Sequence, residues 1–154
     1  MEARLNIDDI DINILSLMQN DAKIGYKDIS NRLGISLGTV HIRIKKLESF
    51  GIIKDFSLNI KYDLLGYELT AFIGLIINSK KANHVISELE KIEEVIELHH
   101  TTGEFHMLAK VLCRNTKTLR QLIIEKVNAI EGIEKTETII SLSELISRKI
   151  NLIK

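Results

Sequence analysis

The chain has 154 residues, of which 45% are hydrophobic and 27% charged, so it can bury a core and does not have the composition of a disordered protein. Its 21 basic and 21 acidic side chains cancel to a formal net charge of zero, which excludes a generally basic nucleic-acid coat protein. The single cysteine excludes an internal disulfide and indicates a reducing compartment. We expect a cytoplasmic protein, because the sequence has neither a signal peptide nor a membrane span.

Three short helices are predicted over the first 50 residues. The first covers residues 7–19, with Asp8 as its cap, and the second covers residues 26–33. Gly34 supplies a tight turn, and Ser36 begins a third helix over residues 36–50. Its apolar side chains recur at helical spacing at Val40, Ile44 and Leu47. A helix, a glycine turn and a basic helix are the layout of a helix-turn-helix, whose second helix enters the DNA major groove.

The outward side of this third helix is predicted to carry Gly38, Ile42, Lys45 and Lys46, with Thr39 and His41 beside them. Ile42 lies on the wrong side for the local core, and a thymine methyl group would explain it. The alternative is a solvated basic surface, with Ile42 against a neighbouring subunit. The predicted DNA contacts are Ser36, Gly38, Thr39, His41, Ile42, Arg43, Lys45, Lys46 and, beyond the helix, Lys54.

The pattern changes after Gly51. Phe56, Leu58 and Ile60 alternate with polar residues, which predicts a strand within residues 52–60. A strand at this point is the wing of a winged helix-turn-helix. The DNA-binding domain is therefore predicted over residues 1–60, followed by a linker over residues 61–66.

Residues 67–154 predict a second, α+β domain. Strands are predicted at 67–77, 95–101, 105–113 and 133–142, and helices at 81–91 and 116–129. Residues 145–154 are either a further strand or a tail. This βαββαβ order is the split ferredoxin-like arrangement, with both helices on one face of the sheet. Leu75, Ile77, Met107 and Ala109 alternate along strands and are expected on the open face, where they would form a dimer interface.

The ordered set of motifs resembles the Lrp/AsnC family of transcription regulators over nearly the whole chain. The matches are Asp8-Asp9-Ile10-Asp11 with Ile14-Leu15, Gly34-Ile35-Ser36 with Val40, Arg43 and Lys46-Leu47-Glu48, Gly51-Ile52-Ile53, Thr102-Gly103-Glu104-Phe105 and Thr136-Glu137-Thr138. The resemblance implies a winged helix-turn-helix followed by a RAM-type βαββαβ domain. It also implies a homodimer, with octamers as the common larger assembly, a palindromic double-stranded DNA operator and an amino-acid effector. Three positions depart from the family pattern: Gly25 replaces a serine or threonine cap, Leu37 replaces proline or alanine, and His106 replaces aspartate.

The turn after the second predicted strand of this domain is the expected effector site. Gly103 permits close backbone approach, exposed amides can hold a carboxylate, and Glu104 can pair with an ammonium group. The predicted effector residues are Thr101, Thr102, Gly103, Glu104, Phe105, His106, Thr136 and Thr138. His106 makes the site pH-sensitive, shifts ligand choice, or means that the site is empty. The alternative is a plain hairpin turn.

Neither a cofactor nor a metal is expected. His99 and His100 are neighbours in a predicted strand and so point to opposite faces, which prevents them from sharing one ion. The sequence has no nucleophile triad order and no phosphate-binding loop, so an enzyme is not predicted. The alternatives are an enzyme similar to the sirohaem decarboxylases, which resemble the same fold, and an architectural DNA binder without an effector.

Overall fold

The protein consists of two compact units. Its structure, a computed structural model, describes residues 6–153. The first unit contains the chain up to Asn59 together with the stretch from Ile146, and the second unit is Ile60–Leu145. The C-terminal stretch therefore groups with the first unit, whereas the predicted division placed it in the second domain.

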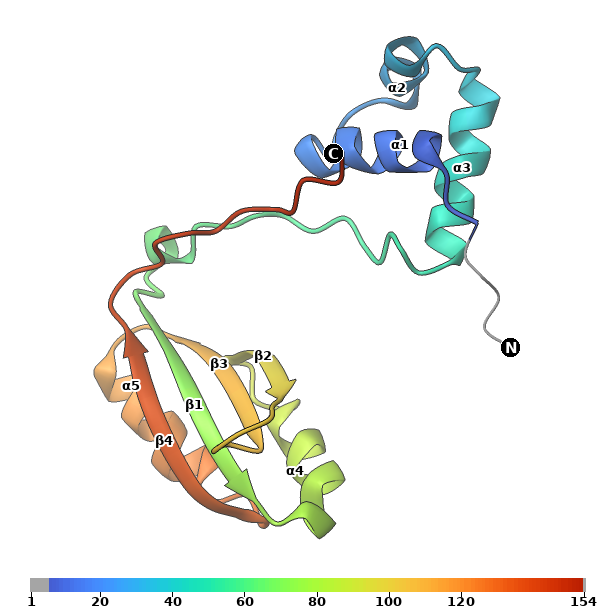
Figure 1. The fold of residues 1–154 in the computed structure, drawn as a ribbon. Helices are drawn as coiled ribbons and strands as arrows, with labels where there is room; N and C mark the ends of the chain where they lie inside the picture. The colour runs from blue at the N-terminus through green and yellow to red at the C-terminus, as the bar shows by residue number, and fades with distance from the viewer. Residues whose placement is uncertain (1–5, 154) are drawn as a thin grey trace. The chain divides into compact units, whose positions relative to one another are not determined.

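Three helices build the first unit (Figure 1). Helix α1 (Asp9–Asn20) begins at a capping box, in which the Asp8 carboxylate accepts from the Asp11 amide at 3.0 Å and the Asp11 carboxylate accepts from the Asp8 amide at 3.2 Å. Helix α2 (Tyr26–Leu33) ends at Gly34, whose φ of 64° favours glycine. Helix α3 (Leu37–Ser49) begins at Ser36, whose hydroxyl accepts from the Thr39 amide at 3.0 Å. All three predicted helices are confirmed.

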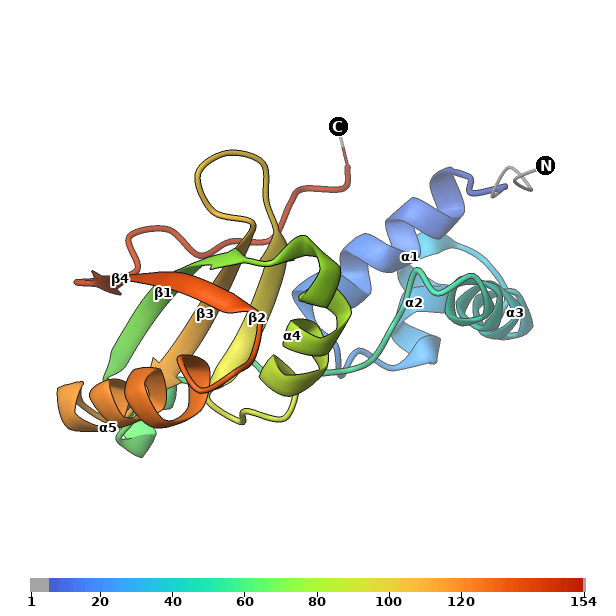
Figure 2. The ribbon, with the colours of Figure 1, turned by 90° about the horizontal axis from the view of Figure 1, so that it is seen from below.

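The core of the first unit lies between these helices. It consists of Ile14, Met18, Ile29, Val40, Ile44 and Leu47. The three members from α3 are completely buried, as the helical spacing predicted. Figure 2 views α3 along its axis, with α1 and α2 on one side of it. The opposite side of α3 is left uncovered by α1 and α2.

Residues 52–60 do not form the predicted strand. Within the described residues, this stretch has no regular secondary structure, and Phe56, Leu58 and Ile60 are exposed. A strand needs a neighbouring strand to pair its backbone, and the alternating pattern here has no such neighbour among the described residues of its own unit. The predicted linker contains a short 3₁₀ helix, η1 (Tyr62–Leu65), which ends at Gly66.

The C-terminal stretch is a tail and not a further strand, as far as the structure describes it, to residue 153. The Lys149 ammonium donates a hydrogen bond to the Gln19 carbonyl at the end of α1. Leu152 and Lys149 line a cavity of about 470 Å³ together with α1 and residues 52–57. The tail thus packs on the first unit.

The second unit confirms the βαββαβ order. Its elements are β1 (Leu69–Ile77), α4 (Ala82–Leu89) after a 3₁₀ turn η2 (Ser79–Lys81), β2 (Val95–His100), β3 (Met107–Cys113), α5 (Thr116–Gln121) continued by the π-helical turn η3 (Leu122–Val127), and β4 (Ile133–Ser141). The strands form one antiparallel sheet in the order β2-β3-β1-β4. Both helices lie behind this sheet in the view of Figure 1.

The predicted assignment of the sheet faces is wrong. Leu75, Ile77, Met107 and Ala109 are buried in the core on the helix side, with exposures of 0–4%. Side chains alternate between the faces of a strand, so the intervening residues take the open face. The larger apolar ones are Phe72, Ile76, Leu108 and Leu112, and Ile139 pairs with Phe72. The open face is apolar, as expected, but through the other alternate set of residues.

Candidate nucleic-acid interface and effector loop

The uncovered side of α3 presents a mixed surface. Ile42 is 71% exposed, and the Lys45 side chain is 66% exposed. The Lys45 ammonium pairs with the Glu48 carboxylate at 3.0 Å, and this hydrogen bond raises the lysine pKa. Gly38 is exposed one turn before Ile42. A glycine, an isoleucine and a lysine therefore follow one another along the side of α3 that faces away from the core.

Some of the other predicted DNA-contacting side chains already contact residues of the first unit. The Thr39 and Ser36 hydroxyls lie 2.8 Å apart at the start of α3. His41 is exposed, and its ring is nearly perpendicular to the Tyr26 ring, with the two centroids 5.6 Å apart. Lys54 lies beyond the helix and is exposed. Three of these four groups belong to the first half of α3 or its cap, the part of a recognition helix that faces base edges.

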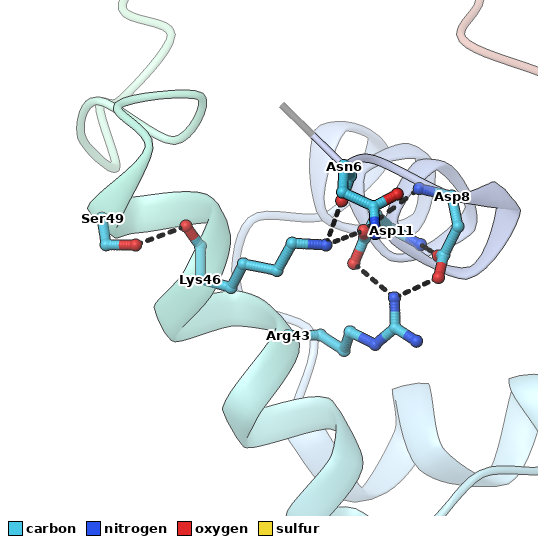
Figure 3. Close-up of polar contacts among 6 residues, drawn as sticks. All are labelled: Asn6, Asp8, Asp11, Arg43, Lys46 and Ser49. Carbon is cyan, nitrogen blue, oxygen red and sulfur yellow. Dashed lines mark hydrogen bonds and ion pairs between the residues drawn. The ribbon is translucent and has the colours of Figure 1, made fainter. Parts of the chain in front are cut away.

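Arg43 and Lys46 point toward α1 (Figure 3). The Arg43 guanidinium donates to Asp8 at 2.5 Å and to Asp11 at 3.1 Å. The Lys46 ammonium donates to the Asp11 carboxylate at 2.6 Å and to the Asn6 carbonyl at 2.5 Å. The prediction that Lys46 lies on the outward side of α3 is wrong. These two cations hold α3 on α1, and of the three basic residues of the helix only Lys45 faces outward.

Asp11 is the centre of this cluster and is completely buried. Burial alone would raise the pKa of its carboxyl, but hydrogen bonds from Lys46, the Asp8 amide and Arg43 outweigh burial and lower the pKa. The Arg43 guanidinium likewise lowers the pKa of Asp8. Sequence reasoning assigned these aspartates only to the cap and dipole of the first helix and missed their partners. The sequence did contain an indication: Asp11 lies three residues before Ile14, so the helical spacing puts this acidic residue on the buried side of the helix.

The predicted effector loop is tied to the end of β1. The Thr101 hydroxyl donates to the Phe105 carbonyl at 2.7 Å, and the Thr101 amide donates to the His106 carbonyl at 3.1 Å. The His106 amide donates to the Leu75 carbonyl at 2.9 Å. The Ile77 amide donates to Nδ1 of His106 at 3.0 Å, so Nδ1 serves as an acceptor here. His106 therefore continues the ladder between β1 and β3 with its side chain.

Phe105 lies on the open face of the sheet at Gly74. A Cβ atom on Gly74 would stand only 2.6 Å from the Phe105 ring, so the glycine makes room for this ring. The tip of the loop, Thr102 to Glu104, is exposed, and Gly103 has a φ of 116° that favours glycine. Sequence reasoning named Phe105 but missed Gly74, although glycine inside a strand indicates a close approach.

Thr136 and Thr138 lie on the other flank of β1. Thr136 pairs with Leu75 and Thr138 with Ile73, both of which face the helices. The Thr136 hydroxyl donates to the Asn128 side chain at 3.0 Å, beside a cavity of about 170 Å³ lined by Asn128 and residues 133–136. The loop at 101–106 contributes nothing to this cavity, so the two groups of predicted effector residues do not meet there.

His99 and His100 follow the predicted geometry. His99 pairs with Leu108, whose side chain takes the open face, and His100 pairs with buried Met107, so the two rings are on opposite faces. Among residues 6–153, no group of three or more histidine, cysteine or acidic side chains is placed to hold a metal ion. In the same range, no helix is long and apolar enough to cross a membrane.

Both units of the chain match known protein families. Residues 7–54 match the winged helix-turn-helix DNA-binding model, and residues 70–150 match the Lrp/AsnC ligand binding domain. The chain is 35% identical over 145 residues to the regulatory protein AsnC of Escherichia coli strain K12, covering 94% of this chain and 95% of that protein. It is 37% identical over 136 residues to the HTH-type transcriptional regulator FL11 of Pyrococcus furiosus, covering 88% and 89% of the two chains.

The solved structures agree in fold. The structure of E. coli AsnC superposes with a TM-score of 0.89 at 34% identity, covering 94% of this chain and 98% of that one. A transcriptional regulator from Neisseria meningitidis, solved as a complex with L-Met, superposes with a TM-score of 0.87 at 21% identity, covering 92% and 94%. The second comparison concerns the fold alone.

Proposed function

The chain belongs to the Lrp/AsnC family of DNA-binding transcription regulators, and from this premise we propose that it binds a palindromic operator as a homodimer and responds to an amino acid. The observation that carries the DNA part is the uncovered side of α3, where exposed Gly38, Ile42 and Lys45 follow one another. In this proposal α3 enters the major groove from its N-terminal half. Its place of action is the cytoplasm, in keeping with the single free cysteine.

Contacts to DNA divide into two kinds. Thr39 and His41 reach base edges near the start of α3, and Ser36 offers its hydroxyl at the helix cap. Lys45 and Lys54 contact phosphates, because both are exposed cations outside the cluster at Asp11. Arg43 and Lys46 act indirectly, by fixing the angle at which α3 packs on α1.

The dimer forms through the open face of the sheet. This face carries Phe72, Ile76, Leu108, Leu112 and Ile139, of which Ile139 is 52% exposed. Two copies of the same apolar face can pack about a two-fold axis, which makes each sheet cover the other. A two-fold dimer presents two copies of α3 and therefore reads a palindrome with fixed half-site spacing.

The effector contacts the loop at 101–106. Its tip is exposed, Gly103 lets a ligand approach the backbone, and Glu104 offers a carboxylate to an ammonium group. The Neisseria regulator of the same fold was solved with L-Met, which supports an amino acid as the class of ligand. His106 accepts from the Ile77 amide through Nδ1, so Nε2 is the ring nitrogen that remains to meet a ligand.

Selection of bound duplexes from random DNA, with and without each of the twenty amino acids, tests these proposals together. We expect a palindromic consensus whose enrichment changes with one or a few amino acids. Lys45→Gln should reduce the salt slope of log K by about 1 per helix, or about 2 per dimer, because one phosphate contact per helix is lost. Lys117→Gln, the same change at an exposed position of α5, is the control and should leave the slope unchanged.

The outcomes separate the parts of the proposal. A consensus without two-fold symmetry contradicts binding as a symmetric dimer. An unchanged consensus and no heat of binding with any amino acid in calorimetry contradict an amino-acid effector. A salt slope that Lys45→Gln and Lys117→Gln change equally contradicts the assigned orientation of α3.

A further inference from the structure

Two residues on the uncovered side of α3 are not needed by the packing of the first unit, as far as residues 6–153 show. The first is Gly38, in the first turn of the helix. Glycine weakens a helix relative to alanine, so it normally has a steric or conformational reason. Neither reason applies here: Gly38 is not among the glycines with positive φ, and a Cβ atom placed on it would only touch the Ser36 hydroxyl at 3.8 Å. Alanine would therefore fit at this position.

The second residue is Ile42, one turn further along the same stripe. Residues four apart lie on the same side of a helix, so Ile42 stands directly after Gly38. Its side chain is 71% exposed, while Val40 and Ile44 on the other side are fully buried. A single exposed apolar residue needs no explanation. An exposed isoleucine beside a glycine that the fold does not need indicates a surface shaped for close contact with something outside the unit.

The chemistry of the major groove identifies that contact. The groove edges of the bases present hydrogen-bond donors and acceptors, and the thymine 5-methyl is the one apolar group among them. An isoleucine side chain can make only apolar contacts. Both residues lie in the first half of α3, the part of a recognition helix that approaches base edges. DNA with a thymine at one defined position fits both observations.

We propose that Gly38 and Ile42 together read a thymine methyl group in each half-site. The missing side chain at Gly38 brings the backbone of α3 close to the groove, and Ile42 packs on the 5-methyl. This inference rests on the proposed entry of α3 into the major groove, and it names the base at one position of the operator. Lys45, three residues after Ile42, lies farther along the same side and contacts the phosphates.

Deoxyuridine substitution tests the proposal at the level of one methyl group. In the selected operator, each thymine is replaced symmetrically in both half-sites by deoxyuridine, which removes the methyl and leaves pairing intact. For the unchanged protein we expect one sensitive position, with a loss of about fourfold per half-site, the ratio for burying one methyl group. For Ile42→Ala, duplexes with thymine and deoxyuridine at that position should bind equally.

Gly38→Ala provides an independent test, because it should not lower the melting temperature but should weaken DNA binding. The melting temperature should stay unchanged or rise by up to about 4 °C, because alanine favours the helix. Affinity for the operator should fall at least about tenfold, because the added methyl holds α3 away from the groove. Ser49→Ala, at the exposed far end of the same helix, is the control and should leave affinity unchanged.

Each contrary result has a distinct meaning. If the protein selects an operator but no deoxyuridine position weakens binding, or if Ile42→Ala keeps the methyl preference, the inference is wrong while DNA recognition stands. If Ile42→Ala changes the oligomeric state and leaves the methyl preference intact, Ile42 belongs to a subunit interface. Gly38→Ala with parental affinity also overturns the inference. Failure to select any operator contradicts the proposed function itself.

Discussion

Replacing Asp11 with asparagine measures how strongly charge holds the recognition helix in place. The change keeps the shape of a fully buried side chain but puts an amide NH₂ where a carboxylate oxygen accepts from Lys46 or Arg43. Removing one partner of a buried ion pair costs about 3–5 kcal/mol. Here the Arg43 and Lys46 side chains are 24% and 26% exposed and can regain water. We therefore expect the free energy of unfolding of the first unit to fall by about 2–3 kcal/mol.

The effect should depend on pH in a defined direction. The folded state lowers the pKa of Asp11, so its contribution is fully present above the ordinary value of 3.8 and disappears as the pH falls through the lower folded pKa. The difference between the parent protein and Asp11→Asn should be constant from about pH 7 to 5 and shrink below about pH 4. The parent should lose stability in the same range, and Asp8, whose pKa is also lowered, acts in the same direction.

Hydrogen exchange and denaturant unfolding provide the assay. At pH 7, exchange in peptides from α1 and α3 should accelerate by about 30- to 150-fold in Asp11→Asn, the equivalent of the expected loss. Urea unfolding by circular dichroism from pH 7 to 3 follows the pH dependence. Asp9→Asn is the control, since Asp9 is an exposed carboxylate in the same helical turn. The reasoning is refuted if the two variants are equally stable at pH 7, or if their difference persists unchanged at pH 3.

Three further changes test other contacts. Phe72→Asp places a charge on the open face of the sheet, so it should convert dimers to monomers in sedimentation while far-UV circular dichroism stays unchanged; an intact dimer would contradict the proposed interface. His106→Ala removes the acceptor of the Ile77 amide, so exchange of that amide should accelerate by about tenfold; unchanged protection means that the imidazole does not hold this amide. Arg43→Gln should destabilise α3 by about 1–3 kcal/mol, and its salt slope for DNA should match the parent, since Arg43 faces α1; a reduced slope means that Arg43 contacts phosphate.

Sequence patterns correctly predicted the cap, the end and the buried side of α3. Ser36 caps the helix, Gly51 follows it with a φ of 68°, and Val40, Ile44 and Leu47 are buried. Each of these depends on residues a few positions apart. The direction of Arg43 and Lys46 depends on Asp11, more than 30 residues earlier, and helical periodicity contains no information on which helix lies beside a given side.

The sheet shows the same limit in another form. Alternation correctly grouped Leu75 with Ile77 and Met107 with Ala109, but both alternate sets of β1 and β3 contain large apolar residues. Because Phe72 and other large apolar residues lie on the open face, the alternation alone does not indicate which set of residues faces the helices. The strand predicted at 52–60 was wrong for a related reason: a strand requires a hydrogen-bonded neighbour, and alternation describes only one of the two partners.

The distribution of charge explains how a chain with zero net charge can contain a DNA-binding domain. Two of the three cations of α3 are neutralised by buried or capping carboxylates of the same unit, and the third has Glu48 beside it. A helix with so little free charge attracts the phosphate backbone weakly, so it gains little from DNA of arbitrary sequence. Under the proposed binding mode, its discrimination comes from contacts inside the groove, where a single methyl or hydrogen bond distinguishes bases. In the proposed dimer, a second copy of α3 multiplies that discrimination, because each half-site contributes its own factor. The ion pairs that hold α3 on α1 at Asp11 fit the same proposal, since groove contacts tolerate less displacement than phosphate contacts do.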